Sequence, residues 1–118
     1  MGCGRVFEGT YSEMLLSLNI IKNLPKETSV YCGHEYTKKN LDFCTEIEFD
    51  NHYLKDKKIW VDLKMSKKEP TIPVTLKEEL NTNIFLRCDT PSVKKALEME
   101  NSSEVEIFKK LRDLKDSF

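Results

Sequence analysis

Apolar residues recur every three or four positions between residues 11 and 24, a spacing that places them on one face of a helix. Thr10 and Glu13 have the spacing of a capping box at the start of this segment. Pro25 interrupts the pattern, so the predicted helix covers residues 11–24. The apolar positions of its face are Met14, Leu18 and Ile21.

The same spacing predicts further helices later in the chain. They cover residues 36–49, 75–80 and about 91–99, and a last one follows Ser103. The start signals are Thr75 with Glu78, Thr90 before Pro91, and Ser103 with Glu106. The connector at residues 69–73 is expected to be extended, because each of its two prolines disfavours helical backbone in the residue before it.

Residues 58–65 fit two patterns. Ile59, Val61, Leu63 and Met65 alternate as in a half-buried strand. However, Leu54, Val61 and Met65 also have the spacing of a helix. Periodicity alone favours the strand.

Residues 29–32 form the one clear strand pattern, which ends at Gly33. A strand on its own leaves backbone N–H and C=O groups unpaired at both edges, which folded proteins avoid. We therefore expect this strand to pair with a second copy or with other polypeptide, as part of a larger sheet.

The chain has 118 residues, of which 39% are apolar and 33% charged, and its net charge is -1. Such a balance argues against nucleic-acid binding, which concentrates Lys and Arg on one face. No apolar run approaches the roughly 20 residues of a membrane span, and the first residues contain no apolar signal core. These features predict a cytoplasmic protein that binds neither nucleic acid nor membrane.

Four cysteines occur without a C-x-x-C pair, so we expect free thiols that serve mainly as small apolar residues. A structural zinc site from Cys32, His34 and Cys44 is disfavoured, because the predicted helix after His34 places Cys44 more than two turns away.

Several ordered segments together carry a family resemblance. They are Gly2–Thr10, Tyr31–Tyr36 with the sequence YCGHEY, Glu69–Pro73, Asn83–Arg87, and the closing Arg112, Lys115, Asp116 and Phe118. The chain resembles the C-terminal part of glyoxalase II, the hydroxyacylglutathione hydrolase family of the metallo-β-lactamase superfamily. It departs at Ile84, where the family tends to have Pro, and at Phe7, where a Tyr is common.

The resemblance implies an α+β fold that is predominantly helical, with one short strand. Residues 1–35 would be a remnant of the metallo-β-lactamase αββα domain, and residues 36–118 the helical glutathione-binding C-terminal domain. The family's layout also implies a helix around Trp60, so we predict a helix at residues 58–65 against the alternation.

The activity implied by the resemblance is hydrolysis of S-D-lactoylglutathione to glutathione and D-lactate at a binuclear metal centre. The metals are usually zinc, with iron or manganese as alternatives, and no side-chain nucleophile is required. His34 matches a metal-binding histidine of the family. No catalytic side chain is assigned in this chain.

Six residues match family positions that contact the substrate's glutathione. Tyr36 and Asn40 lie four apart on a predicted helix, and Arg112 and Lys115 match a cationic pair that binds the glycine carboxylate. Arg5 and Phe7 complete the set.

The family's other metal ligands precede the residue that matches Gly2, and one histidine cannot hold a zinc ion tightly. We therefore expect this chain to be a C-terminal fragment of such an enzyme, inactive and without tightly bound metal when isolated. The alternative is a non-catalytic helical module that binds a partner or self-associates through its exposed strand.

Overall fold

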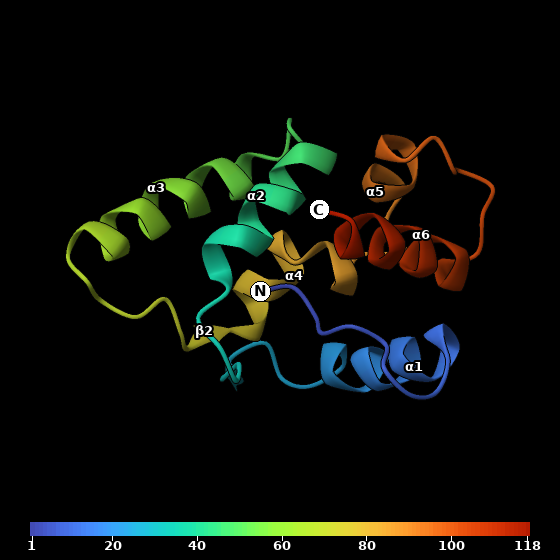
Figure 1. The fold of residues 1–118 in the computed structure, drawn as a ribbon, viewed down its shortest axis with the longest axis horizontal. Helices are drawn as coiled ribbons and strands as arrows, with labels where there is room; N and C mark the ends of the chain where they lie inside the picture. The colour runs from blue at the N-terminus through green and yellow to red at the C-terminus, as the bar shows by residue number, and fades with distance from the viewer.

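The computed structural model describes all of residues 1–118 and shows six α-helices, one 3-10 turn and a two-stranded sheet (Figure 1). The elements in order are α1 (Tyr11–Lys22), β1 (Ser29–Val30), α2 (Thr37–Ile47), α3 (His52–Ser66), β2 (Val74–Thr75), α4 (Leu76–Thr82), η1 (Ile84–Leu86), α5 (Pro91–Ala96) and α6 (Glu104–Asp116). The expectation of a mostly helical α+β fold is confirmed.

All three predicted capping boxes form. The side chains of Thr10, Thr75 and Ser103 each accept a hydrogen bond from the backbone N–H three residues later, and the glutamate there accepts one from the backbone N–H of the cap. These reciprocal bonds satisfy backbone groups that a helix start would otherwise leave unpaired. Consequently α1, α4 and α6 begin where the sequence predicts.

The ambiguous segment at residues 58–65 belongs to α3, as the resemblance implied. Of its four alternating apolar residues only Val61 is buried, while Ile59, Leu63 and Met65 are exposed. Leu54, two helical turns before Val61, lies in the same core. The period of the buried positions is therefore helical, and the alternation carried no structural information.

The prediction that the strand beginning at Ser29 has no partner within this chain is wrong. β1 pairs with β2 in antiparallel register, Ser29 opposite Thr75 and Val30 opposite Val74. One partner of β1 therefore comes from this chain, whereas the second edge of β1 has no partner within the two-stranded sheet, and self-association or pairing with other polypeptide through that edge stays a prediction. β1 is also shorter than the predicted strand at residues 29–32, since it ends at Val30.

Aromatic rings fill the centre of the core. The Phe85 ring centroid lies 6.1 Å from that of Phe43 and 6.0 Å from that of Phe108, so η1 meets both α2 and α6. α1 lies along α6 at one side of this core, and α2 lies against α3 at the other (Figure 1). The buried cluster comprises Met1, Leu15, Leu41, Phe43, Cys44, Leu54, Val61, Ile84, Phe85, Cys88, Val93, Ile107, Phe108 and Leu111.

α1 is apolar on two sides. Leu15 is buried in the core, whereas Leu16 and Ile20, spaced four apart, leave an exposed apolar stripe along its outer side. Contiguous exposed apolar side chains of this kind often mark a surface that another polypeptide covers. None of the six helices combines the length and the apolar character that a membrane span requires.

The cysteines are free thiols, as expected, and two of them, Cys44 and Cys88, are core residues. Burial raises the pKa of Cys44 and of Cys88 to about 12, and raises the pKa of Cys3 to about 11. These thiols therefore stay protonated in the folded protein at pH values where an unfolded chain would lose their protons.

This difference predicts a loss of stability at alkaline pH. Between pH 9 and pH 11 the folded state binds more protons than the unfolded state, so the free energy of unfolding falls as pH rises, by about 1 kcal/mol per pH unit for each buried thiol. Urea unfolding of wild type and Cys88→Ala at several pH values measures this. The slope should be shallower in the variant by about that amount, and identical slopes would contradict the prediction.

Candidate functional site

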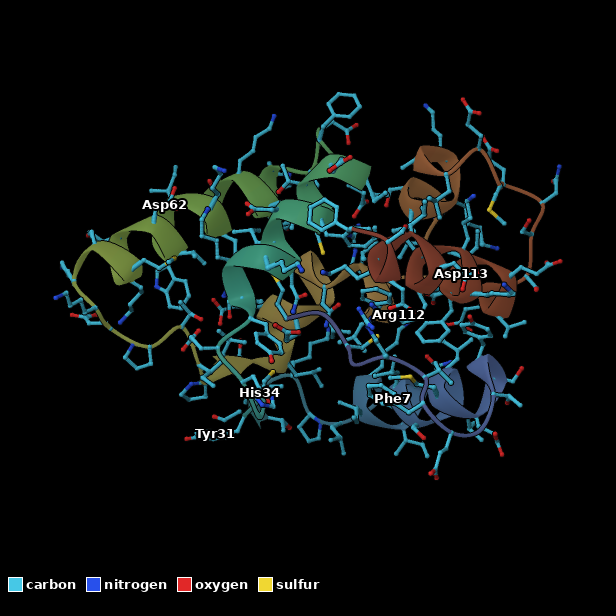
Figure 2. The ribbon with its side chains drawn as sticks, in the orientation of Figure 1. Phe7, Tyr31, His34, Asp62, Arg112 and Asp113 are labelled. Carbon is cyan, nitrogen blue, oxygen red and sulfur yellow. The ribbon has the colours of Figure 1, made fainter.

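The segment between β1 and α2 presents the predicted metal ligand. His34 is exposed, and its ring stacks on that of Tyr36 with centroids 4.9 Å apart and planes 5° from parallel. Tyr36 precedes the first residue of α2 and is 61% exposed. Figure 2 shows His34 and Tyr31 together at one edge of the molecule. The structure thus brings two predicted site residues, His34 and Tyr36, together on an accessible surface.

A complete metal site is not present around His34. No three His, Cys, Asp or Glu residues group anywhere in the chain in a way that could hold a metal ion. Zinc requires about four ligands, three of them from protein even in a catalytic site. The residues of this chain therefore do not fit a zinc centre by themselves, whether around His34 or with the neighbouring cysteines.

The segment Met1–Gly4 is held by side chains from three places in the fold. Asn40 on α2 donates to the Met1 carbonyl at 2.8 Å, and Asn83, after α4, donates to the Gly2 carbonyl at 2.9 Å. Arg112 on α6 donates through Nη1 to the carbonyls of Cys3 at 2.8 Å and Gly4 at 3.3 Å. Four consecutive carbonyls are thus satisfied by side chains, which fixes this segment across the helices.

Arg112 is buried although it is charged, with 4% of its surface exposed. Its Nη2 lies 2.8 Å from Oδ1 of Asp116, and its guanidinium lies over the Phe85 ring, 5.0 Å from the centroid. Asn40 and Arg112, both predicted to contact glutathione, thus bind this chain's own backbone. Their roles toward a substrate stay predictions.

Gly2 offers a test of this arrangement. Its φ is +85°, and a Cβ placed there would lie 2.5 Å from Nδ2 of Asn40. We predict that Gly2→Ala lowers the free energy of unfolding by about 1 to 2 kcal/mol, because the backbone conformation disfavours a side chain and Asn40 must move. Urea unfolding measures the loss. Gly4→Ala is the matched control, since a Cβ at Gly4 meets nothing within 4 Å; equal losses in both variants would contradict the prediction.

Lys115, the partner of Arg112 in the predicted cationic pair, differs from Arg112 in its contacts. Its ammonium lies 5.1 Å from the Phe118 ring centroid and 5.7 Å from that of Phe43, and it pairs with no carboxylate. Burial lowers the pKa of Lys115, and the nearby positive charges of Lys39 and Arg112 lower it further. Lys115 therefore offers an unpaired charge at the junction of α2 and α6.

Arg5 and Phe7 lie on the outer side of the segment that leads to α1. Arg5 is exposed, with Nε 3.6 Å from Oδ1 of Asp116, and Phe7 is 86% exposed. Both line an open hollow of about 570 Å³ between this segment and α1. In Figure 2, Phe7 lies over α1 on the same lower side as His34, but well apart from it.

Two residues close to these groups were not singled out from the sequence. Lys39 adds positive charge beside Lys115, and Asn83 holds the Gly2 carbonyl while also donating to Glu79 at 2.8 Å. Lys39 directly precedes Asn40, so a search for charges beside the predicted ligands would have found it. Nothing in the sequence indicates the long-range partner of Asn83.

Comparison with known proteins gives one consistent result. Residues 35–118 match the family model described as "Hydroxyacylglutathione hydrolase C-terminus". The chain is 52% identical over all 118 residues to a hydroxyacylglutathione hydrolase of Pelagibacter ubique, covering 44% of that protein. It is 44% identical over its whole length to one of Maricaulis maris and 45% identical over 117 residues to one of Rhodopseudomonas palustris, covering 46% of each.

The chain thus spans about half the length of the curated relatives it matches. The family match covers most of the chain and contains the end of the GHEY motif from Glu35 onward, α2 and α6. The resemblance noted from the motifs is confirmed, and the chain belongs to the hydroxyacylglutathione hydrolase family.

Proposed function

We propose that residues 1–118 form the glutathione-binding part of an enzyme that hydrolyses a 2-hydroxyacylglutathione thioester, S-D-lactoylglutathione, to glutathione and D-lactate. The observation that carries this proposal is the 52% identity, over the whole chain, to a protein named hydroxyacylglutathione hydrolase. The division into a region 1–35 and a helical glutathione-binding region 36–118 is part of the same proposal.

The junction of α2 and α6 supports the binding role. Glutathione carries two carboxylates, and a positive charge with no protein partner favours such a ligand. Lys115 supplies this charge, Lys39 adds a second nearby, and Tyr36 is exposed at the start of α2. Binding at this surface would hold the thioester in place for attack, which lowers the entropic part of the reaction barrier.

His34 is proposed as the one metal ligand that this chain contributes, to a binuclear centre of zinc, or of iron or manganese. Because no further ligands group around it, the others would come from polypeptide outside residues 1–118. The exposed apolar stripe of α1 supports the presence of such polypeptide on this side of the molecule. The four free thiols fit a reducing compartment, so we propose a cytoplasmic location.

A chimera tests the function. The part of the Pelagibacter ubique relative that precedes the matched region would be joined to residues 1–118, and loss of the S-D-lactoylglutathione thioester would be followed spectroscopically. We expect the chimera to bind metal and hydrolyse the thioester, and the 118-residue chain alone to do neither.

Two results would contradict this proposal. A folded, metal-loaded chimera without thioesterase activity would remove the assigned reaction, and stoichiometric metal binding by the 118-residue chain would remove the need for outside ligands. His34→Ala in the chimera should lower metal content, whereas the control His52→Ala should not, because His52 matches no metal ligand of the family.

A further inference from the structure

Glu35, between His34 and Tyr36, is bound to a segment far away in the sequence. The backbone N–H of Thr71 donates to Glu35 Oε2 at 3.1 Å, and the Thr71 hydroxyl donates to Oε1. Thr71 lies in the connector between α3 and β2, 36 residues from Glu35. One carboxylate therefore joins the segment before α2 to the segment before β2.

Thr37, the first residue of α2, completes the group. Its hydroxyl lies 2.6 Å from that of Thr71 and 3.4 Å from Glu35 Oε1. Both threonines are buried. Both hydroxyls can donate to the Glu35 carboxylate, and each also lies within hydrogen-bond distance of the other, so the three side chains form one hydrogen-bonded group. The donors from Thr71 stabilise the ionised form and hold the pKa of Glu35 below its usual value.

Little else fixes the backbone around His34. β1 ends at Val30, Gly33 has open space around it, and Tyr36 has no side-chain hydrogen bond as a helix cap. The side chain of His34 makes no hydrogen bond, and its one ring contact is with Tyr36. A segment of this kind would open locally at a small free-energy cost unless another contact held it.

We propose that Glu35 is a positioning residue, whose carboxylate, held by Thr71 and Thr37, ties residues 33–36 to the connector before β2 and so fixes His34 and Tyr36 relative to each other. The contact is a property of this chain alone. What His34 and Tyr36 bind rests on the proposed function, and a site whose side chains are held in place binds more tightly than a mobile one.

The first experiment uses the 118-residue chain and needs neither metal nor substrate. Amide hydrogen exchange and proton NMR would compare wild type with Glu35→Gln and Thr71→Val. We expect exchange of the Thr71 amide, which donates to Glu35, to accelerate by about tenfold in Glu35→Gln, and the ring-to-ring NOEs between His34 and Tyr36 to weaken in both variants. Thr71→Ser keeps both donors and should retain the wild-type values.

Matched controls separate this effect from a general loss of stability. Glu46→Gln changes an exposed glutamate on α2, and Thr45→Val removes a hydroxyl that donates within α2, to the Leu41 carbonyl. Neither should alter the exchange of the Thr71 amide or the NOEs between His34 and Tyr36. Unchanged exchange and unchanged NOEs in Glu35→Gln would overturn the proposal; because Glu35 is exposed, that variant decides the matter even if Thr71→Val fails to fold.

The second experiment uses the chimera. Glu35→Gln should weaken metal affinity by about tenfold, as is typical when a residue that orients a ligand is lost, and Thr71→Ser should not. If the wild-type chimera is inactive, the proposed function fails while the NMR result still judges the positioning role. An active chimera whose metal affinity is unchanged by Glu35→Gln would overturn the link between this contact and His34.

Discussion

Replacing Phe85 with Ala should lower the free energy of unfolding by about 3 to 5 kcal/mol, the range found when a large aromatic side chain is deleted from a core. Phe85 is 1% exposed and lies between the rings of Phe43 and Phe108. The Arg112 guanidinium lies over the same ring. The truncation therefore leaves a cavity where η1, α2 and α6 meet, and these elements can close it only by moving together.

Urea unfolding followed by circular dichroism would measure the loss. Phe49→Ala is the matched control, because Phe49 is 75% exposed just beyond α2 and its removal leaves no cavity. We expect that control to change the free energy of unfolding by less than about 1 kcal/mol. A similar loss in both variants would mean that Phe85 is not the centre of the core.

The helices of this fold could be predicted from the sequence because their signals are local. Each capping box involves two residues three apart, and helical spacing is visible within a few turns. Residues 58–65 show the limit of this reasoning: their alternation predicts a strand, and only the buried partners of Val61 make them helical. The family resemblance corrected that interpretation, whereas periodicity could not.

β2 could not be predicted for a related reason. It consists of Val74 and Thr75, and Thr75 is also the cap of α4. Two residues are too few to show alternation, and the helix signal that follows conceals them. The error about β1 arose from this missing partner, since a strand can be judged unpaired only when every other strand has been found.

In the candidate site, too, the local features could be predicted from the sequence and the long-range contacts could not. The closeness of His34 and Tyr36 follows from their spacing, so the motif was sufficient to predict it. The partners of Arg112 lie 108 and 109 residues away, in the backbone of Gly4 and Cys3. Backbone carbonyls carry no sequence signal, so a structural role for this arginine could not be distinguished from a substrate-binding one.

Although Arg112 and Lys115 were assigned together as one cationic pair, we expect their replacement by Ala to have different effects on the free energy of unfolding. Arg112→Ala should lower the free energy of unfolding by about 3 kcal/mol, because it leaves the carbonyls of Cys3 and Gly4 without a donor and removes the buried partner of Asp116. Lys115→Ala should change it by less than about 1 kcal/mol, since its ammonium has no carboxylate partner. Urea unfolding of the two variants measures both changes.

If Lys115 contacts glutathione, its replacement should weaken substrate binding although it hardly affects stability. In the active chimera, Lys115→Ala should raise KM for S-D-lactoylglutathione by about tenfold with kcat nearly unchanged, which corresponds to the loss of one charge-assisted hydrogen bond of about 1.5 kcal/mol. Lys110→Ala, an exposed lysine of α6 without an ion pair, is the control and should change neither quantity. An unchanged KM in Lys115→Ala would mean that this unpaired charge does not bind the substrate, and the cationic binding surface would then have to be sought at Arg5, on the outer side of the segment that leads to α1.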